Sequence, residues 1–97
     1  DASTLTIGRA QYSCMPNGKG GIVDDLIIYK IKEEQYLLVV NASNIDKDWD
    51  WINLQNKNFG VGLRDISDSY CLFAVQGTKA ISKIRNVLEN NRCIQAV

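Results

Sequence analysis

Hydrophobic and polar positions along the first half of the chain alternate in three short stretches that are typical of β-strands. The apolar positions predict strands over residues 10–15, 22–31 and 36–42. Between the first two, "PNGKGG" combines Pro, Asn and three Gly residues and predicts a turn, while "KEEQ" predicts a hairpin between the second and third. The G-x-G-G in that turn joins two strands and opens no helix, so we interpret it as a turn and not as a phosphate-binding loop.

The pattern then changes to helical spacing in "SNIDKDWDWINLQNK". Ile45, Trp49 and Ile52 fall at i, i+4 and i+7, which predicts one apolar face of a helix. Ser43 and Asp46 have the spacing of a capping box and predict the helix start.

Two further strands, over 61–66 and 70–76, and a second helix are predicted in the remainder. Thr78 is the predicted cap of this helix, and its apolar stripe consists of Ile81, Ile84, Val87 and Leu88. The predicted order is therefore β-β-β-α-β-β-α, an α+β fold with two helices packed on a mostly antiparallel sheet. With 97 residues, of which 45% are hydrophobic, residues 1–97 are expected to form a single domain.

The charge balance narrows the choice of partners. Eleven basic and eleven acidic residues cancel and are scattered along the chain, so neither a nucleic acid nor an anionic membrane is favoured as a partner. The apolar runs are too short to span a bilayer. We expect neither nucleic-acid binding nor a membrane location.

Cysteine and histidine usage limits the chemistry. Cys14, Cys71 and Cys93 are odd in number and form no CxxC, and the chain contains no His. A disulfide framework and a zinc site are therefore not indicated, and His-based catalysis is excluded. We expect a reducing, cytoplasmic location.

The strongest candidate for chemistry is the pair of aspartates in "GGIVDDLIIYK", since Asp is poor in strands and rarely buried without a partner. Strand alternation places Asp25 on the face with Val23, Ile27, Tyr29 and Ile31, whereas Asp24 shares its face with Lys30. If the more apolar face is enclosed, Asp25 is the desolvated carboxylate with a raised pKa, and Asp24 reaches water. The alternative is that both only cap the strand beside the glycine turn.

Hairpin register adds an amide to this site. With a three-residue loop at 32–34, Asp25 lies opposite Asn41, whereas an even-numbered loop would put Asn41 on the other face. Val39 and Leu37 share the Asn41 face and would line the site. A carboxylate and an amide in an apolar wall are typical of a small-molecule pocket.

Three segments, "AQYSCMPNGKGGIVDDLIIYKI", "YLLVVNASNIDKDWDWI" and "LFAVQGTKA", together resemble the aminomethyltransferase of the glycine cleavage system, the T-protein. The resemblance runs in order through essentially the whole chain and corresponds to part of the N-terminal folate-binding region of that family. We therefore expect the chain to be a fragment of a longer protein.

The resemblance implies an activity. T-proteins take the aminomethyl group carried on the lipoyl arm of the H-protein and transfer its carbon to tetrahydrofolate, without a metal. The products are methylenetetrahydrofolate, ammonia and the reduced lipoyl arm. The expected partners are therefore the lipoylated H-protein and tetrahydrofolate, which is the acceptor substrate.

The resemblance also implies residue roles. The second aspartate of "DDL", Asp25, corresponds to the family's catalytic residue, and Asn41 and Val39 of "VVNA" correspond to folate contacts. Thr78 stands where the family usually has Pro. Further folate contacts of the family lie beyond residue 97, so the isolated chain is predicted to be inactive.

Two alternatives to an aminomethyltransferase remain open on the sequence. One is the folate-binding domain of a related protein, such as a sarcosine or dimethylglycine oxidase or a folate-dependent iron-sulfur assembly factor. The other is a non-catalytic interaction module, although the presence of both Asp25 and Asn41 argues against it.

Overall fold

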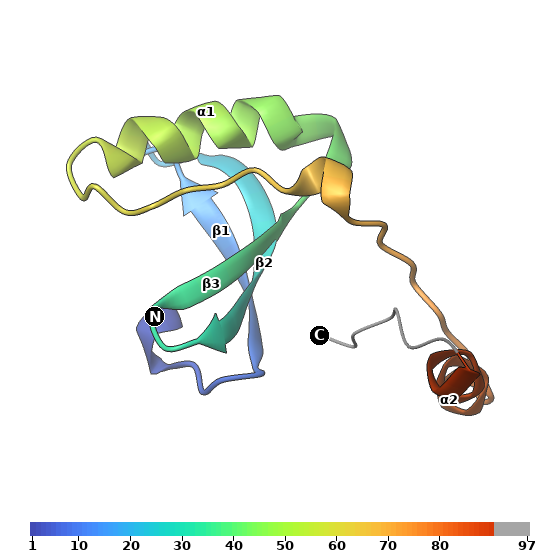
Figure 1. Ribbon diagram of the computed structural model, residues 1–97. Coiled ribbons are helices and arrows are strands. Elements are labelled where there is room, and N and C mark those ends of the chain that lie inside the picture. Colours follow the sequence, from blue (N-terminus) through green and yellow to red (C-terminus); the bar gives the residue numbers. More distant parts are fainter. Residues whose placement is uncertain (91–97) are drawn as a thin grey trace. The chain divides into compact units, whose positions relative to one another are not determined.

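The computed structural model describes residues 1–90. The described chain divides into two compact units, Asp1–Asp65 and the segment that begins at Ile66. The first unit holds a three-stranded antiparallel sheet in the order β1-β2-β3, preceded by a 3-10 turn at Ala2–Thr4. Its strands are β1 (Ala10–Pro16), β2 (Ile22–Lys32) and β3 (Gln35–Val40), and the helix α1 (Ile45–Asn56) lies across one end of the sheet (Figure 1). The three predicted strands and the first predicted helix are confirmed.

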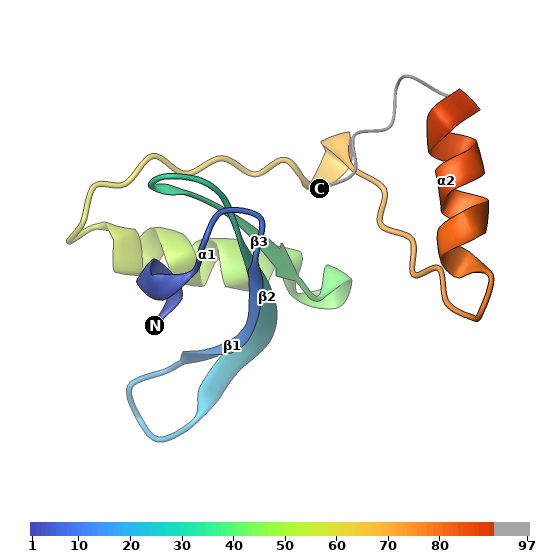
Figure 2. The ribbon, with the colours of Figure 1, turned by 90° about the horizontal axis from the view of Figure 1, so that it is seen from below.

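The glycine-rich segment between β1 and β2 is the loop that joins these two strands (Figure 2). The side chain of Asn17 organises this turn. The Asn17 Oδ1 atom accepts hydrogen bonds from the backbone N–H groups of Lys19 and Gly21, at 2.8 and 3.0 Å. Gly20 has a φ of +82°, which glycine adopts without the steric cost of a Cβ. The segment is a turn, as predicted.

The hairpin between β2 and β3 differs from the prediction in its loop but not in its register. Lys32 pairs with Gln35, which leaves a two-residue loop, and the register shifts between Lys30 and Lys32. The irregularity restores the parity that an even loop would otherwise invert. Further along the ladder Leu26 pairs with Val40, so that Asp25 and Asn41 face each other as the odd-loop register requires.

Helix α1 begins differently from the predicted capping box. A 3-10 turn at Ala42–Asn44 leads into it, Asn44 is its N-cap residue, and no side chain makes a capping hydrogen bond. The capping box of Ser43 and Asp46 is therefore wrong, since the helix starts one residue later than that spacing requires. The Asn44 side chain instead points to β2, where its Nδ2 atom donates to the Asp24 carboxylate.

Helix α1 packs against one face of the sheet, at the end of the sheet where β2 begins. On this face Leu26, which is 4% exposed, forms the centre of the small core. Leu26 and Ile28 line one apolar hollow together with Trp51 and Ile52 of α1. In β1 the alternation of half-buried and exposed residues follows the same division, so its odd-numbered positions lie on the covered face.

The C-terminal end of α1 is closed by Asn56. Its side chain donates to the Val61 carbonyl at 2.7 Å and accepts from the Val61 N–H at 2.8 Å. These two bonds fold the chain back directly after the helix.

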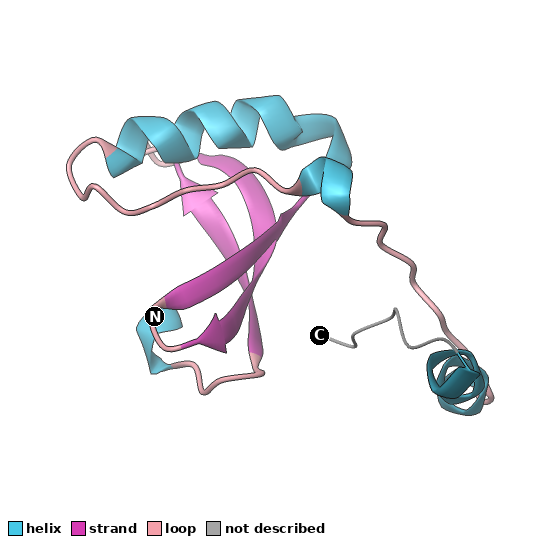
Figure 3. Ribbon diagram, in the orientation of Figure 1, coloured by secondary structure: helices cyan, strands magenta, loops and turns pink. Residues whose placement is uncertain are grey.

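The segments 61–66 and 70–76, predicted as strands, are not paired in the structure (Figure 3). A strand needs a neighbouring ladder to satisfy its backbone, and within residues 1–90 these segments have none. Between them lies a 3-10 turn at Ser67–Ser69, and the second unit contains the helix α2 (Ala80–Asn90), which confirms the second predicted helix. The α+β fold class with an antiparallel sheet and two helices is thus confirmed. Neither helix of the described chain is long and apolar enough to cross a bilayer.

Candidate functional site

A cluster of five polar side chains lies where β2 begins, β3 ends and α1 starts. Asp24 and Asp25 come from β2, Asn41 follows β3, and Asn44 and Asp48 belong to the start of α1. Since β2 and β3 are antiparallel, the first residues of one meet the last residues of the other. The sequence separation of about twenty residues is closed by the hairpin and the short turn after β3.

Asn41 is the centre of this cluster. Its Nδ2 atom lies 2.7 Å from Asp25 Oδ1, 3.0 Å from Asp24 Oδ1 and 3.3 Å from the Asp25 carbonyl oxygen. One amide group thus contacts both carboxylates, and the predicted proximity of Asp25 and Asn41 is met by a direct hydrogen bond.

Asp25 is half-buried and both of its carboxylate oxygens accept hydrogen bonds. Oδ1 accepts from Asn41, and Oδ2 accepts from the Tyr12 hydroxyl across the β1–β2 ladder. The hydrogen bond to Asp25 and the negative charge of that carboxylate raise the pKa of the Tyr12 phenol. The carboxylate therefore stands at the sheet surface between two donors, with Tyr12 exposed beside it.

Asp24, and not Asp25, is the buried member of the pair, with 8% of its surface exposed. The enclosed face is the Asp24 face and not the more apolar Asp25 face, because α1 packs on the Asp24 face. The condition under which Asp25 would be desolvated and Asp24 would reach water is therefore not met. Asp24 accepts hydrogen bonds from Asn44 Nδ2 at 2.8 Å, from Asn41 and from the backbone N–H of Asp25 at 2.9 Å. The hydrogen bond from Asn44, followed by those from Asp25 and Asn41, lowers the pKa of Asp24 against the opposing effect of burial.

A third carboxyl group, Asp48 of α1, has no exposed surface at all. Burial is the largest cause that raises the pKa of Asp48, and the adjacent Asp24 carboxylate is the second. The sequence did not single out Asp48, because on the helical repeat it counts as one of several acidic residues near a helix start.

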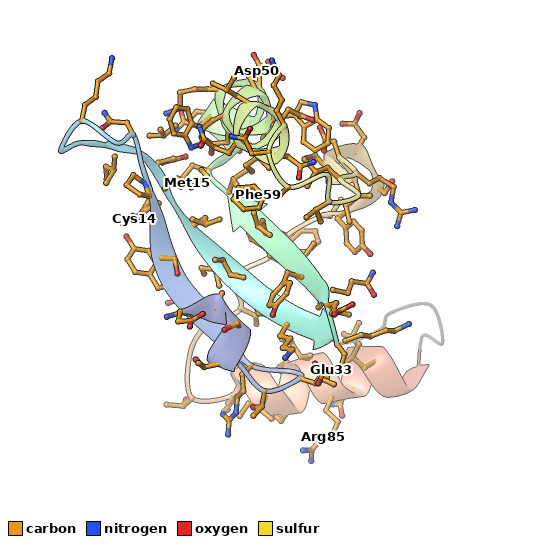
Figure 4. All side chains as sticks on the ribbon, turned by 90° about the vertical axis from the view of Figure 1, so that its left-hand side faces the viewer. Cys14, Met15, Glu33, Asp50, Phe59 and Arg85 are labelled. Carbon is orange, nitrogen blue, oxygen red and sulfur yellow. The ribbon has the colours of Figure 1, made fainter. Side chains whose placement is uncertain are left out.

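The Asp25 face of the sheet is open and largely apolar. Tyr12 is 71% exposed and pairs with Ile27, which is 36% exposed, and on the other side Ile27 pairs with Val39. Cys14 and Met15, neighbours in β1, lie on opposite sides of that strand, with Cys14 on the open face opposite Asp25 (Figure 4). A flat ring with polar edges could rest on this wall and reach Asp25 and Asn41 at its end.

Sequence reasoning missed Tyr12 and Asn44 as partners of the aspartates. The register of the first hairpin would have found Tyr12, because Cys14 lies opposite Asp25 and Tyr12 is two residues away on the same face. Asn44 lies one helical turn before Asp48. Its contact with Asp24 could be predicted only by knowing which face of the helix packs against the sheet.

No group of three or more potential metal ligands occurs in the part of the chain that the structure describes. Cys14 and Cys71 are free thiols and both are exposed. The third cysteine, Cys93, lies outside the described residues.

The first unit belongs to the class of α+β domains. Its three-stranded antiparallel sheet carries a carboxylate and an amide at the edge of an apolar open face. The family comparison agrees with the resemblance seen in the sequence. The model of the GCVT N-terminal domain matches residues 1–96, and the chain belongs to this family.

Curated relatives of this chain are named aminomethyltransferase. That of Flavobacterium psychrophilum is 59% identical over 87 residues, which is 90% of this chain and 24% of the relative. Those of Phocaeicola vulgatus and Deinococcus deserti are 45% and 55% identical over 91 and 80 residues, covering 94% and 82% of this chain and 25% and 22% of the relatives. The chain thus spans about a quarter of the length of these relatives, and no solved structure matches it significantly.

Proposed function

We infer that this chain supplies one wall of the folate site of a glycine-cleavage aminomethyltransferase, the T-protein. The observation that carries the proposal is the Asp25 carboxylate, held between Tyr12 and Asn41 at the edge of an open apolar face. Family membership and relatives named aminomethyltransferase support the same reaction class. Tetrahydrofolate is the proposed acceptor, and the proposed donor is the aminomethyl group on the lipoyl arm of the H-protein.

The reaction makes clear what a carboxylate can contribute. The transferred carbon loses its bonds to the amine nitrogen and to the lipoyl sulfur and gains bonds to two folate nitrogens. The two protons released from those nitrogens end on ammonia and on the thiol of the reduced lipoyl arm. Positive iminium charge develops on the way, and an anion nearby stabilises it.

Asp25 is the residue proposed to provide that anion and to take part in proton movement. Its two hydrogen-bonded oxygens are fixed in direction, so the carboxylate is held in place before substrate arrives. Val39 lies on the same face, one pairing step from Asp25, and would contact the folate ring, while Asn41 would orient it and Asp25 together.

The isolated chain is proposed to lack transferase activity, since it corresponds to about a quarter of the relatives' length. A cytoplasmic location is proposed from the two free thiols among the described residues, since reduced cysteines are the rule in that compartment.

The test uses a full-length host, the Flavobacterium psychrophilum aminomethyltransferase carrying this chain's residues in the matching segment. Tetrahydrofolate-dependent ammonia release from aminomethylated H-protein should fall about a hundredfold or more on Asp25→Asn. The thermal midpoint should change little, because Asp25 lies at the open face.

Asp24→Asn is the matched control. Asp24 accepts three hydrogen bonds under α1, so this change should lower the thermal midpoint and leave more of the rate. Equal loss of activity in two folded variants would contradict the role proposed for Asp25. A folate-binding host without ammonia release would instead indicate a related folate-binding protein.

A further inference from the structure

Asp48 is a carboxyl group that the proposed chemistry does not use. It is 0% exposed, and neither of its oxygens has a hydrogen-bond donor within residues 1–90. An ionised carboxylate without donors or a counter-charge is too costly to bury, so a group in this position must either find a partner or become neutral.

The start of α1 fixes which group Asp48 meets. Asn44, one helical turn earlier, donates to Asp24 Oδ2 at 2.8 Å, and Lys47 donates through Nζ to the Val23 carbonyl at 2.7 Å. These bonds hold the first turns of α1 over the beginning of β2. Asp24 and Asp48 are both buried, and their carboxyl groups lie next to each other between helix and sheet.

Two carboxyl groups in such a position form a hydrogen bond only when one of them carries a proton. Asp24 receives three donors, all of which favour its ionised form, and Asp48 receives none. The proton therefore belongs on Asp48, which then serves as the donor. A neutral Asp48 also removes the cost of its burial.

We propose that Asp48 is a positioning residue. Its carboxyl group keeps its proton and donates a hydrogen bond to the Asp24 carboxylate, and through Asp24 it holds Asn41 against Asp25. The chain of contacts runs from the helix to the sheet edge, since Asn41 Nδ2 touches both Asp24 Oδ1 and Asp25 Oδ1. The part of this proposal that concerns catalysis rests on the function proposed above for Asp25.

The charged groups that face Asp48 come from both packed elements. Asp24 and Asp25 of β2 favour the neutral form, and Lys47 of α1 opposes them. Lys47 is exposed and its ammonium group is bound to a backbone carbonyl, so it does not neutralise a buried anion at Asp48. The directions agree with the geometry, because the pKa of Asp48 is raised and that of Asp24 is lowered.

The first test observes the proton directly. Infrared spectra of the chain and of the full-length host, near neutral pH, should contain the carbonyl stretch of a protonated carboxylic acid. This band should disappear in Asp48→Asn and persist in Asp50→Asn, which removes an exposed carboxylate from the same helix. Absence of the band from both folded proteins, or its persistence in Asp48→Asn, would overturn the proposal.

The second test uses the pH dependence of unfolding. Because the folded pKa of Asp48 is raised, its contribution to stability is complete at low pH and is lost as the pH rises through that value. Asp48→Asn keeps a neutral donor of the same size, so its stability relative to wild type should increase with pH. A difference between the two that does not change with pH would contradict the assignment.

The third test measures ammonia release by the host. Asp48→Asn should retain most of the activity because the amide can donate to Asp24, whereas Asp48→Leu should lose about tenfold to a hundredfold through displacement of Asn41 and Asp25. A loss in folded Asp48→Asn equal to that of Asp48→Leu would contradict the positioning role. An inactive wild-type host would count against the proposed function alone, since the infrared band does not depend on it.

Discussion

Asp24 and Asp25 are consecutive residues of β2 that lie on opposite faces of the strand, and the two faces have opposite environments. On one face Asp24 and Leu26 are buried under α1, and on the other Asp25 and Ile27 stand open beside the exposed Tyr12. The strand alternation is the same for both faces, so the difference comes entirely from the position of the helix. The buried face stabilises the unit, and the open face presents its chemistry.

The covered face of β2 can stabilise the unit only if its buried polar side chains have hydrogen-bond or ion-pair partners. Both polar side chains of this face have them. Asp24 accepts three hydrogen bonds, and Lys30, further along the same face, is 8% exposed and pairs with Glu33 at 3.1 Å. The open face has a different requirement: its carboxylate must remain reachable. Asp25 meets this because its two donors approach from the sheet itself.

The largest expected effect on stability separates Leu26 from Ile27. Leu26→Ala should lower the free energy of unfolding by about 2–5 kcal/mol, because it removes a side chain from the core under α1. Ile27→Ala should cost clearly less, because Ile27 is already 36% exposed. Urea unfolding of the chain, followed by circular dichroism, measures both. Equal destabilisation would mean that the two faces do not differ in burial.

A smaller, pH-dependent effect is expected at the contact between helix and sheet. Asn44→Ala removes the main cause of the lowered pKa of Asp24. A lowered folded pKa stabilises the protein above the unfolded value, about 3.9, and this contribution is lost as the pH falls. Asn44→Ala should therefore destabilise the chain near neutral pH, and the difference from wild type should shrink in acid.

The matched control for this change is Asn53→Ala. Asn53 donates to the Trp49 carbonyl within α1 at 2.8 Å and touches no carboxylate. Its effect on unfolding should be the same at neutral and acidic pH. A pH-independent effect of Asn44→Ala would show that Asn44 does not act through the charge of Asp24.

The contact between Asp25 and Asn41 could be predicted from the sequence because it depends only on strand parity and register. The loop has two residues and not the three that this register assumed, and the irregularity between Lys30 and Lys32 compensates for the shorter turn. A prediction from strand parity remains correct when a loop that is one residue shorter is offset by one extra residue in the strand.

The burial of Asp24 could not be predicted in the same way. The sequence of β2 alone says that one face is more apolar, but the face that α1 covers depends on the turn after β3 and on the bond from Asn44 to Asp24. The two missing strands have a similar cause. The segments 61–66 and 70–76 have the composition of strands, but pairing depends on partners that the sequence of one segment does not reveal.

The smallest expected effect probes the open face through Tyr12. Replacing Tyr12 with Phe removes one of the two hydrogen bonds on Asp25 and should reduce ammonia release in the full-length host by less than about tenfold. Asn41→Ala should cost more, because this amide contacts both aspartates. A larger loss of ammonia release in Tyr12→Phe than in Asn41→Ala would mean that the hydrogen bond from β1 contributes most to holding Asp25.

The same hydrogen bond can be followed without any substrate, by the ultraviolet titration of wild type minus Tyr12→Phe. The Tyr12 phenol should lose its proton above the ordinary tyrosine value of about 10, because its hydroxyl donates to Asp25 and its phenolate would lie beside that carboxylate. The stability that this bond contributes is complete below that value and is lost as the pH rises through the folded pKa. Asp25→Asn removes the negative charge and should return the phenol toward its ordinary range, whereas Asp50→Asn, on the exposed side of α1, should leave it unchanged. If Asp25→Asn left the titration where it is in wild type, the Tyr12 hydroxyl would have to be bound elsewhere, and Asp25 would depend on Asn41 alone.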